Sequence, residues 1–318
     1  MRCRDALVWS SVVVFGLSFG WISKSHAAAN DQEPRPYTIR TTSRLVLLDV
    51  SVRDSSGGIV GDLTKENFTI YEDGKRQEIT QFAHADTPVT VGLVVDESGS
   101  MRQKQAEVIT AALAFIRGSN PQDEIFVINF NEKPRRGLPD LQLFSDNASE
   151  LRDALWRGVP EGRTALYDAI EMALRQLDMG RQEKKTLVVV SDGGDNVSAH
   201  KLQDVMNDVR RSVATIYTIG IFDEEDPDRN PGVLKQIAKV SGGEAFFPKK
   251  LDEIGAICSD IAKDIRARYT IGYVPVSGDK ASERHTKVIA TSPSGQKLVV
   301  KARTSYLFAP EPEETGSP

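Results

Sequence analysis

The sequence predicts an α/β fold with a doubly wound, mostly parallel central sheet, combined with a small β-sandwich built from the flanking segments. Between Pro88 and Arg266, apolar runs alternate with segments of helical period, which is typical of successive βα units. Runs such as Val91–Val95 lack polar alternation, which favours strands buried on both faces of a sheet. The segments before and after this region have strand patterns only.

Composition excludes some classes of protein. The chain has 318 residues, of which 40% are hydrophobic and 27% are charged, as in ordinary globular proteins. This length suffices for one large domain and a smaller companion. The formal net charge is −5, and no basic run with interleaved aromatic residues occurs, so nucleic-acid binding is not expected.

Residues 1–27 are predicted to be a signal peptide. Arg2 and Arg4 precede an apolar stretch, Ala6–Ile22, and Ser25-His26-Ala27 provides a small-x-small cleavage pattern. Cleavage would send the chain to the periplasm, the cell surface or the medium, with no membrane span left. The alternative is an uncleaved anchor, because the apolar stretch approaches the length needed to span a bilayer.

The mature chain would retain a single cysteine, Cys258, so no internal disulfide can form. It follows the apolar pattern of its segment and is expected to be a buried structural thiol.

The first part of the predicted sandwich is residues 38–87, after a polar linker at 28–37. An alternating strand is expected at 44–53, and a second at 68–74 ends in an Asp-Gly turn typical of a hairpin. A return strand is expected at 77–82.

The α/β domain is predicted at residues 88–266. Its expected strands are 89–95, 124–130, 141–144, 186–190, 214–221 and 245–247. Its expected helices are 103–117, 148–156, 165–179, 202–212, 233–240 and 251–266.

Residues 267–308 return to a β pattern, with strands expected at 269–274, 285–291 and 298–308. The Pro- and Glu-rich tail, 309–318, is predicted to be disordered. Neither β segment alone would bury an adequate core. We therefore expect one sandwich made from both segments, with the α/β domain inserted between them.

Oxygen-bearing side chains gather where the first buried strand ends. Asp96, Ser98 and Ser100 occupy alternate positions of a turn that leads into a helix. Ligands bind beyond the carboxyl ends of strands in such sheets, and hard oxygens suit a small cation such as Mg²⁺. The alternative is an ordinary strand-to-helix turn with N-capping serines.

This D-x-S-x-S motif and the βα order that follows resemble the von Willebrand factor type A (VWA) family and its metal-ion-dependent adhesion site. Two further motif positions are matched: Thr164 precedes a helix in the segment Gly162–Asp168, and Asp192 ends the apolar run that begins at Leu187. The flanking segments resemble a bacterial exported family that carries VWA domains, through Val60–Phe68, Tyr71–Gly74 and Tyr269-Thr-Ile-Gly-Tyr273.

The resemblance implies a Rossmann-like domain that binds Mg²⁺, with Mn²⁺ or Ca²⁺ as alternatives. Ser98 and Ser100 would bind the cation directly, and Thr164 directly or through water. Asp96 and Asp192 would act largely through water. An Asp or Glu carboxylate of a partner protein would fill the remaining position, which makes the chain an exported, metal-dependent adhesion module. Its oligomeric state is not predicted.

Four further residues are weaker candidates for the rim of this site: Glu97, Gly162, Arg163 and Asp195. Glu97 would tune the charge of the site or be solvated, and Asp195 would support the site or belong to a turn. The acidic segment 223–228 would attract cations or form a solvated loop.

Two other functions are alternatives to the adhesion module. In one, the chain is a structural or assembly protein of the cell envelope, with the α/β domain as a scaffold. In the other, it is a metal-dependent hydrolase. The D-x-S-x-S motif differs from the G-x-S-x-G motif of hydrolases. His84, His200 and His285 sit in polar segments without the pattern of a catalytic base and its partner, so we do not expect the chain to be an enzyme.

Overall fold

A computed structural model describes residues 45–222, 229–276 and 281–309. The predicted signal peptide, the linker, the acidic segment 223–228 and nearly all of the predicted tail lie outside these ranges. Among the described residues, no helix is both long and apolar enough to cross a bilayer.

The central sheet is mostly parallel, as predicted. It contains, in spatial order, β10 (Ala245–Phe246), β9 (Thr215–Gly220), β8 (Lys184–Ser191), β5 (Val89–Asp96), β6 (Glu124–Phe130) and β7 (Pro134–Arg136). Only the β6–β7 pair is antiparallel among the described strands of this sheet. The order of strands in the sheet places the parallel strands β5 and β8 side by side, so their carboxyl ends meet at the same edge of the sheet.

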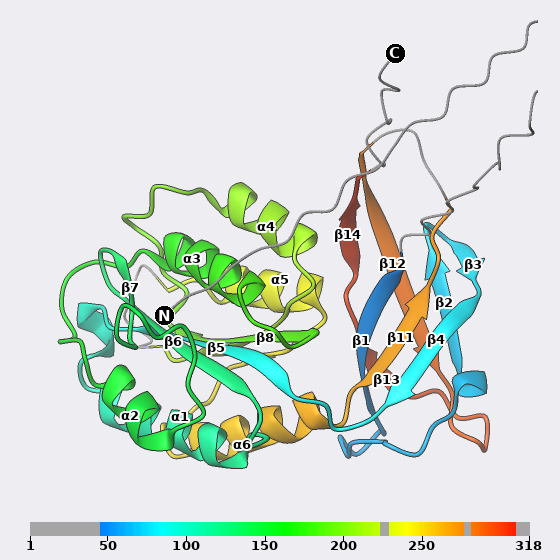
Figure 1. Cartoon of the computed structure of the whole chain (residues 1–318), viewed down its shortest axis with the longest axis horizontal. Helices are drawn as coiled ribbons and strands as arrows, with labels where there is room; N and C mark the ends of the chain where they lie inside the picture. Colours follow the sequence, from blue (N-terminus) through cyan, green and yellow to red (C-terminus); the bar gives the residue numbers. More distant parts are fainter. Residues whose placement is uncertain (1–44, 223–228, 277–280, 310–318) are drawn as a thin grey trace, which may run out of the picture. The chain divides into compact units, whose positions relative to one another are not determined.

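Helices cover both faces of this sheet (Figure 1). One face carries α1 (Gln105–Gly118), α2 (Ala148–Leu155) and α6 (Glu253–Arg266). The other carries α3 (Leu166–Asp178), α4 (Leu202–Arg211) and α5 (Pro231–Ser241). The fold is therefore doubly wound. Gly242 caps the carboxyl end of α5, and its φ of 86° is the left-handed conformation that favours glycine.

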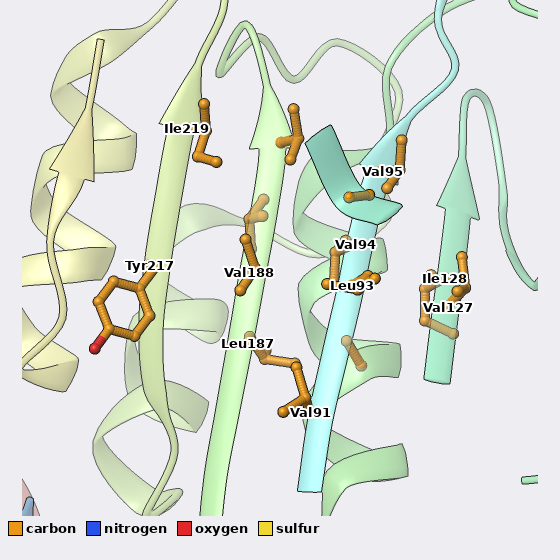
Figure 2. Close-up of a cluster of buried hydrophobic side chains, with 14 of the residues drawn as sticks. Val91, Leu93, Val94, Val95, Val127, Ile128, Leu187, Val188, Tyr217 and Ile219 are labelled. Carbon is orange, nitrogen blue, oxygen red and sulfur yellow. The ribbon is translucent and has the colours of Figure 1, made fainter. Parts of the chain in front are cut away.

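The core of the α/β domain consists mainly of apolar side chains from the strands of the sheet and from the helices that cover it, and several of the strand residues are drawn in Figure 2. Every residue of β5 is buried. Gly92 is required in this strand, because a Cβ there would lie 2.4 Å from the Phe126 ring and 2.5 Å from Leu187. Cys258 is a buried free thiol, as predicted, and burial raises its pKa to about 12.

The flanking segments form antiparallel sheets that share a second core. One sheet has the order β13 (Val299–Lys301), β1 (Val46–Arg53), β11 (Tyr269–Tyr273) and β4 (Ile79–His84). The other has the order β14 (Ser305–Phe308), β12 (Ser282–Ala290), β2 (Phe68–Glu72) and β3 (Lys75–Gln77). Both sheets combine strands from before and after the α/β domain, which confirms the predicted sandwich.

Three predicted strands were wrong: one does not form, and two are divided between the sheets. No strand forms at 141–144: Leu141 is exposed and Phe144 packs edge-on against Phe126, while 134–136 folds back on β6. The return strand expected at 77–82 is divided, since β3 pairs with β2 and β4 pairs with β11 in the other sheet. The run at 298–308 is divided in the same way between β1 and β12.

Candidate metal centre

The candidate site begins where β5 and β8 end. Val95 is in register with Val190, so Asp96 and Ser191 lie next to each other at the sheet edge. The Ser191 hydroxyl donates to Asp96 Oδ2 at 2.7 Å, and the Ser98 backbone N–H donates to Asp96 Oδ1 at 2.8 Å. Asp96 is 2% exposed, so both of its carboxylate oxygens are held in place by protein donors.

The two serines of the motif connect this carboxylate to the next strand end. Ser98 precedes a 3₁₀ turn, Gly99–Met101, which contains Ser100 and lies before α1. The Ser98 and Ser100 hydroxyl oxygens lie 3.1 Å apart, and the Ser100 hydroxyl donates to Asp192 Oδ2 at 2.6 Å. Asp96, Ser98, Ser100 and Asp192 thus form one connected set of oxygen atoms, with Ser98 and Asp192 buried and Ser100 half-buried.

Thr164 lies on a loop that is attached on both sides. The Gly99 N–H donates to the Gly162 carbonyl at 3.1 Å, which joins the loop to the 3₁₀ turn. The Thr164 N–H donates to Asn196 Oδ1 at 3.0 Å, and the Asn196 N–H donates to the Thr164 carbonyl at 3.0 Å. Among the described contacts, no hydrogen bond joins the Thr164 hydroxyl itself to the other four side chains.

The electrostatics of this set suit a cation. Burial, together with the nearby charge of Asp192, raises the pKa of Asp96 to about 7, although hydrogen bonds from Ser98 and Ser191 act in the opposite direction. A second carboxylate beside a buried one is unfavourable unless a positive charge lies between them.

In the described ranges no group of three or more His, Cys, Asp and Glu could hold a metal, so such a site depends on hydroxyl oxygens. Carboxylate and hydroxyl oxygens are ligands that hard divalent cations accept. The residues present therefore fit a cation of this kind.

Glu97 differs from its sequence interpretation as a rim or solvated residue. Its side chain is buried and forms an ion pair with Arg135, a residue that no sequence pattern singled out. Its backbone N–H donates to the Phe130 carbonyl at 2.7 Å, and its carbonyl accepts from the Glu161 N–H at 3.0 Å. Glu97 thus faces away from the oxygen set and supports the loop before Thr164.

The other rim candidates have structural partners. Gly162 has a φ of 78° and carries the carbonyl that binds Gly99. Arg163 is exposed and donates to the Asn196 carbonyl. Asp195 accepts from the Tyr167 N–H at 2.9 Å and from the Ser198 hydroxyl at 2.5 Å, so it caps the start of α3.

Contrary to the sequence analysis, His200 does have a carboxylate partner. Its ring nitrogen Nδ1 lies 2.7 Å from Asp168 Oδ1. No described hydrogen bond brings the His200 ring to Ser98 or Ser100, so this pair does not form a nucleophile and base arrangement with either serine.

The fold and site define a doubly wound α/β domain with an oxygen-rich centre at the carboxyl edge of its sheet. The sequence model of the von Willebrand factor type A domain family matches residues 90–264. The chain belongs to this family.

A comparison with solved structures agrees with this fold. The structure is similar to that of a von Willebrand factor type A protein from Catenulispora acidiphila, with a TM-score of 0.52 and 15% identity, over 78% of this chain and 74% of that one. An uncharacterized protein of Synechocystis sp. is 28% identical over 166 residues, which are 50% of this chain and 37% of that protein. The match thus spans well under two thirds of that relative's length.

Proposed function

We propose that this chain is an exported, non-enzymatic binding module that captures a carboxylate of a partner protein through a bound divalent cation. Asp96, Ser98, Ser100, Thr164 and Asp192 would hold the cation, and Mg²⁺ is the metal that this oxygen set fits best, ahead of Mn²⁺ and Ca²⁺. The observation that carries the proposal is the connected chain of oxygen atoms from Ser98 through Ser100 to Asp192, beside the buried Asp96.

The neutral hydroxyls and the charged carboxylates would have different roles at the cation. Hydroxyls that bind directly leave a cation with much of its positive charge, because a neutral oxygen compensates less charge than a carboxylate does. Asp96 and Asp192 would orient these hydroxyls and bound water. When bound, the cation supplies an electrophilic position that an external carboxylate can occupy with a charge-assisted contact.

Removal of one carboxylate tests the cation site. In isothermal titration calorimetry with MgCl₂, Asp192→Ala should weaken binding at least about tenfold, or about 1.4 kcal/mol. Thr164→Ala should also weaken Mg²⁺ binding, whereas Asp140→Ala, at an exposed aspartate of another loop, should leave it unchanged. Equal Mg²⁺ affinity in wild type and Asp192→Ala would show the site assignment to be wrong.

The binding function needs a second measurement. A pull-down from envelope extract, analysed by mass spectrometry, should recover proteins with wild type in Mg²⁺ but not in EDTA and not with Asp192→Ala. Proteins recovered equally in all three conditions would instead favour a scaffold role for the α/β domain and the sandwich. Sequencing of the mature N-terminus checks export, and cleavage after Ala27 is the expected result.

The domain limits are also part of the proposal. We place the β-sandwich in residues 38–87 and 267–308 and the VWA domain in residues 88–266, because each region has its own buried apolar cluster. Limited proteolysis should leave the VWA domain as a resistant fragment within these limits.

A further inference from the structure

A basic pocket opens directly beside the candidate cation site. It has a volume of about 680 Å³ and includes Ser100, one of the proposed cation ligands, in its wall. The rest of its wall comes from residues just before α1, residues just after β9 and the segment between β10 and α6. Ligand pockets in proteins commonly have volumes of roughly 300–1,000 Å³, so this one has room for more than a single side chain.

The described residues that line this pocket carry charge of one sign, while the acidic segment 223–228, which follows Phe222, lies outside the described ranges. Among the described residues that line it, four are basic, Arg102, Lys104, Lys249 and Lys250, and none is acidic. They come from the 3₁₀ turn after β5 and from the segment before α6, which are distant in sequence. A concave surface with charges of one sign concentrates its field and attracts ligands of the opposite sign.

The basic side chains differ in their freedom to bind. Lys104 is buried, and its ammonium group donates to the Ile221 carbonyl at 3.2 Å, so it is already engaged within the protein and is not among the groups that would bind a ligand. Arg102 donates through Nε to the Pro160 carbonyl at 3.1 Å. Lys249 and Lys250 are exposed, and within the described ranges neither they nor Arg102 forms an ion pair.

The Glu253 carboxylate lies close to the exposed lysines of this pocket. Glu253 Oε2 accepts the backbone N–H of Lys249 at 2.9 Å, at the start of α6, and it does not line the pocket. The pocket also has an apolar side at Phe222, whose ring stacks on Phe247 at 5.4 Å. Its surface therefore combines positive charge with an aromatic wall.

We propose that the ligand of this module is an acidic peptide segment with at least two carboxylates, one directed to the cation beside Ser100 and a second bound in the basic pocket by Lys249, Lys250 and Arg102. This inference rests on the proposed function and names the partner class for the same site. A single carboxylate occurs on nearly every protein surface, so a second, spaced contact is what allows the module to discriminate between partners.

Peptide selection tests the inference. A random peptide display library is bound to the full mature chain in Mg²⁺ and eluted with EDTA. Wild type should enrich peptides with two spaced acidic residues. Lys249→Gln/Lys250→Gln should enrich peptides with one acidic residue, and Lys75→Gln/Arg76→Gln, an exposed basic pair on β3, should give the wild-type result.

Binding of the selected sequences is then measured with fluorescein-labelled synthetic peptides. Lys249→Gln/Lys250→Gln should bind a two-acid peptide about threefold to tenfold more weakly than wild type does, with unchanged Mg²⁺ affinity in calorimetry. The loss should shrink as salt is added, because exposed charge pairs are screened.

The failures are distinguishable. If no peptide is eluted by EDTA from wild type, the proposed function fails and this inference fails with it. If EDTA elutes peptides with one acidic residue only, or if the lysine variant selects the same two-acid peptides as wild type, the basic pocket is not a binding subsite while the cation-dependent function stands.

Discussion

At the scale of single residues, Glu97 shows that neighbouring positions of one motif can have different roles, one at the candidate cation site and one in the protein interior. Ser98 and Ser100 face the oxygen set, whereas the Glu97 side chain enters the protein and pairs with Arg135. Gly158 lies against this pair: a Cβ there would be 1.7 Å from Glu97 Oε2 and 2.1 Å from Arg135 Nη2. The ion pair thus needs a glycine in the loop that leads to Thr164.

Gly158→Ala tests this support. The added methyl group must displace the ion pair, which we expect to cost about 1–3 kcal/mol in the free energy of unfolding. Because the same loop carries Thr164, Mg²⁺ binding should weaken as well. Both quantities are measured by urea denaturation and calorimetry.

Gly255→Ala is the matched control. Gly255 lies in α6 with nothing within 4 Å of a Cβ, so alanine should stabilise the chain by about 0.5–1 kcal/mol through its higher helix propensity. If Gly158→Ala is as stable as wild type, Glu97 and Arg135 do not hold the loop in place.

At the scale of elements, reciprocal capping joins α3 to the segment that follows β8. Asp168, in the first turn of α3, accepts the backbone N–H groups of Ala199 and His200, each at 3.0 Å. In the other direction, Asp195 accepts the Tyr167 N–H. The loop that begins with Asp192 and the helix that follows Thr164 are therefore attached to each other.

This attachment predicts a pH dependence of stability. The hydrogen bond with Asp168 raises the pKa of His200 above its ordinary value of 6.5, and the charges of Glu171 and Asp204 act in the same direction. A histidine with a raised folded-state pKa contributes stability that is complete below the unfolded pKa and is lost as the pH rises through the folded pKa. The contribution is therefore present in mildly acidic solution and absent in alkaline solution.

Thermal denaturation of His200→Ala at acidic and alkaline pH measures this contribution. Wild type should exceed the variant by up to about 1 kcal/mol on the acidic side, because the pair is partly exposed, and the difference should shrink on the alkaline side. His285→Ala is the control, since that ring is 70% exposed and 3.8 Å from its closest aspartate oxygen, Asp73 Oδ1. A difference that grows with pH would contradict the assignment.

At the scale of the whole molecule, a buried polar network connects the two cores. Asp264 on α6 accepts from the Ser51 hydroxyl of β1 and the Tyr217 hydroxyl of β9, each at 2.5 Å. Arg268, which is 3% exposed, pairs with Asp264 and also donates to the Asp49 and Gly242 carbonyls. Burial alone would raise the pKa of Asp264, but the charge of Arg268 and these hydrogen bonds hold it below its ordinary value.

Two aspartates on α6 allow a matched comparison. Asp264→Ala leaves the Arg268 guanidinium buried without its counter-ion, which should lower the free energy of unfolding by about 3–5 kcal/mol. Asp260→Ala removes a carboxylate that is 41% exposed and pairs with Arg53, so its cost should be below about 1 kcal/mol. Urea denaturation measures both, and similar costs for the two variants would contradict a structural role for the network.

Much of the fold was predictable because local periodicity reports burial. The unbroken apolar run of β5 indicated a central strand, and the apolar stripe of α3 indicated a helix against the sheet. The Asp-Gly turn after β2 is present with φ values of 46° and 79°, as its residue types suggested. The family and its motif positions were also accessible, since motif spacing along the chain is a local property.

Pairing between distant segments was not predictable in the same way. An alternating run such as 298–308 fits either sheet of a sandwich, and only the partners β1 and β12 decide where it divides. Likewise, the apolar residues at 141–144 resembled a strand, but Phe144 packs against Phe126 and Leu141 is exposed.

The sequence by itself thus determined most of the elements and their order, the family and the oxygen-bearing residues of the candidate site. The tertiary structure alone decided that Glu97 is buried against Arg135 and that Arg102 and Lys250 line one pocket. The physical reason is that helix and strand formation depends on neighbours a few positions away, whereas charge and burial at a site depend on contacts between segments that only folding brings together.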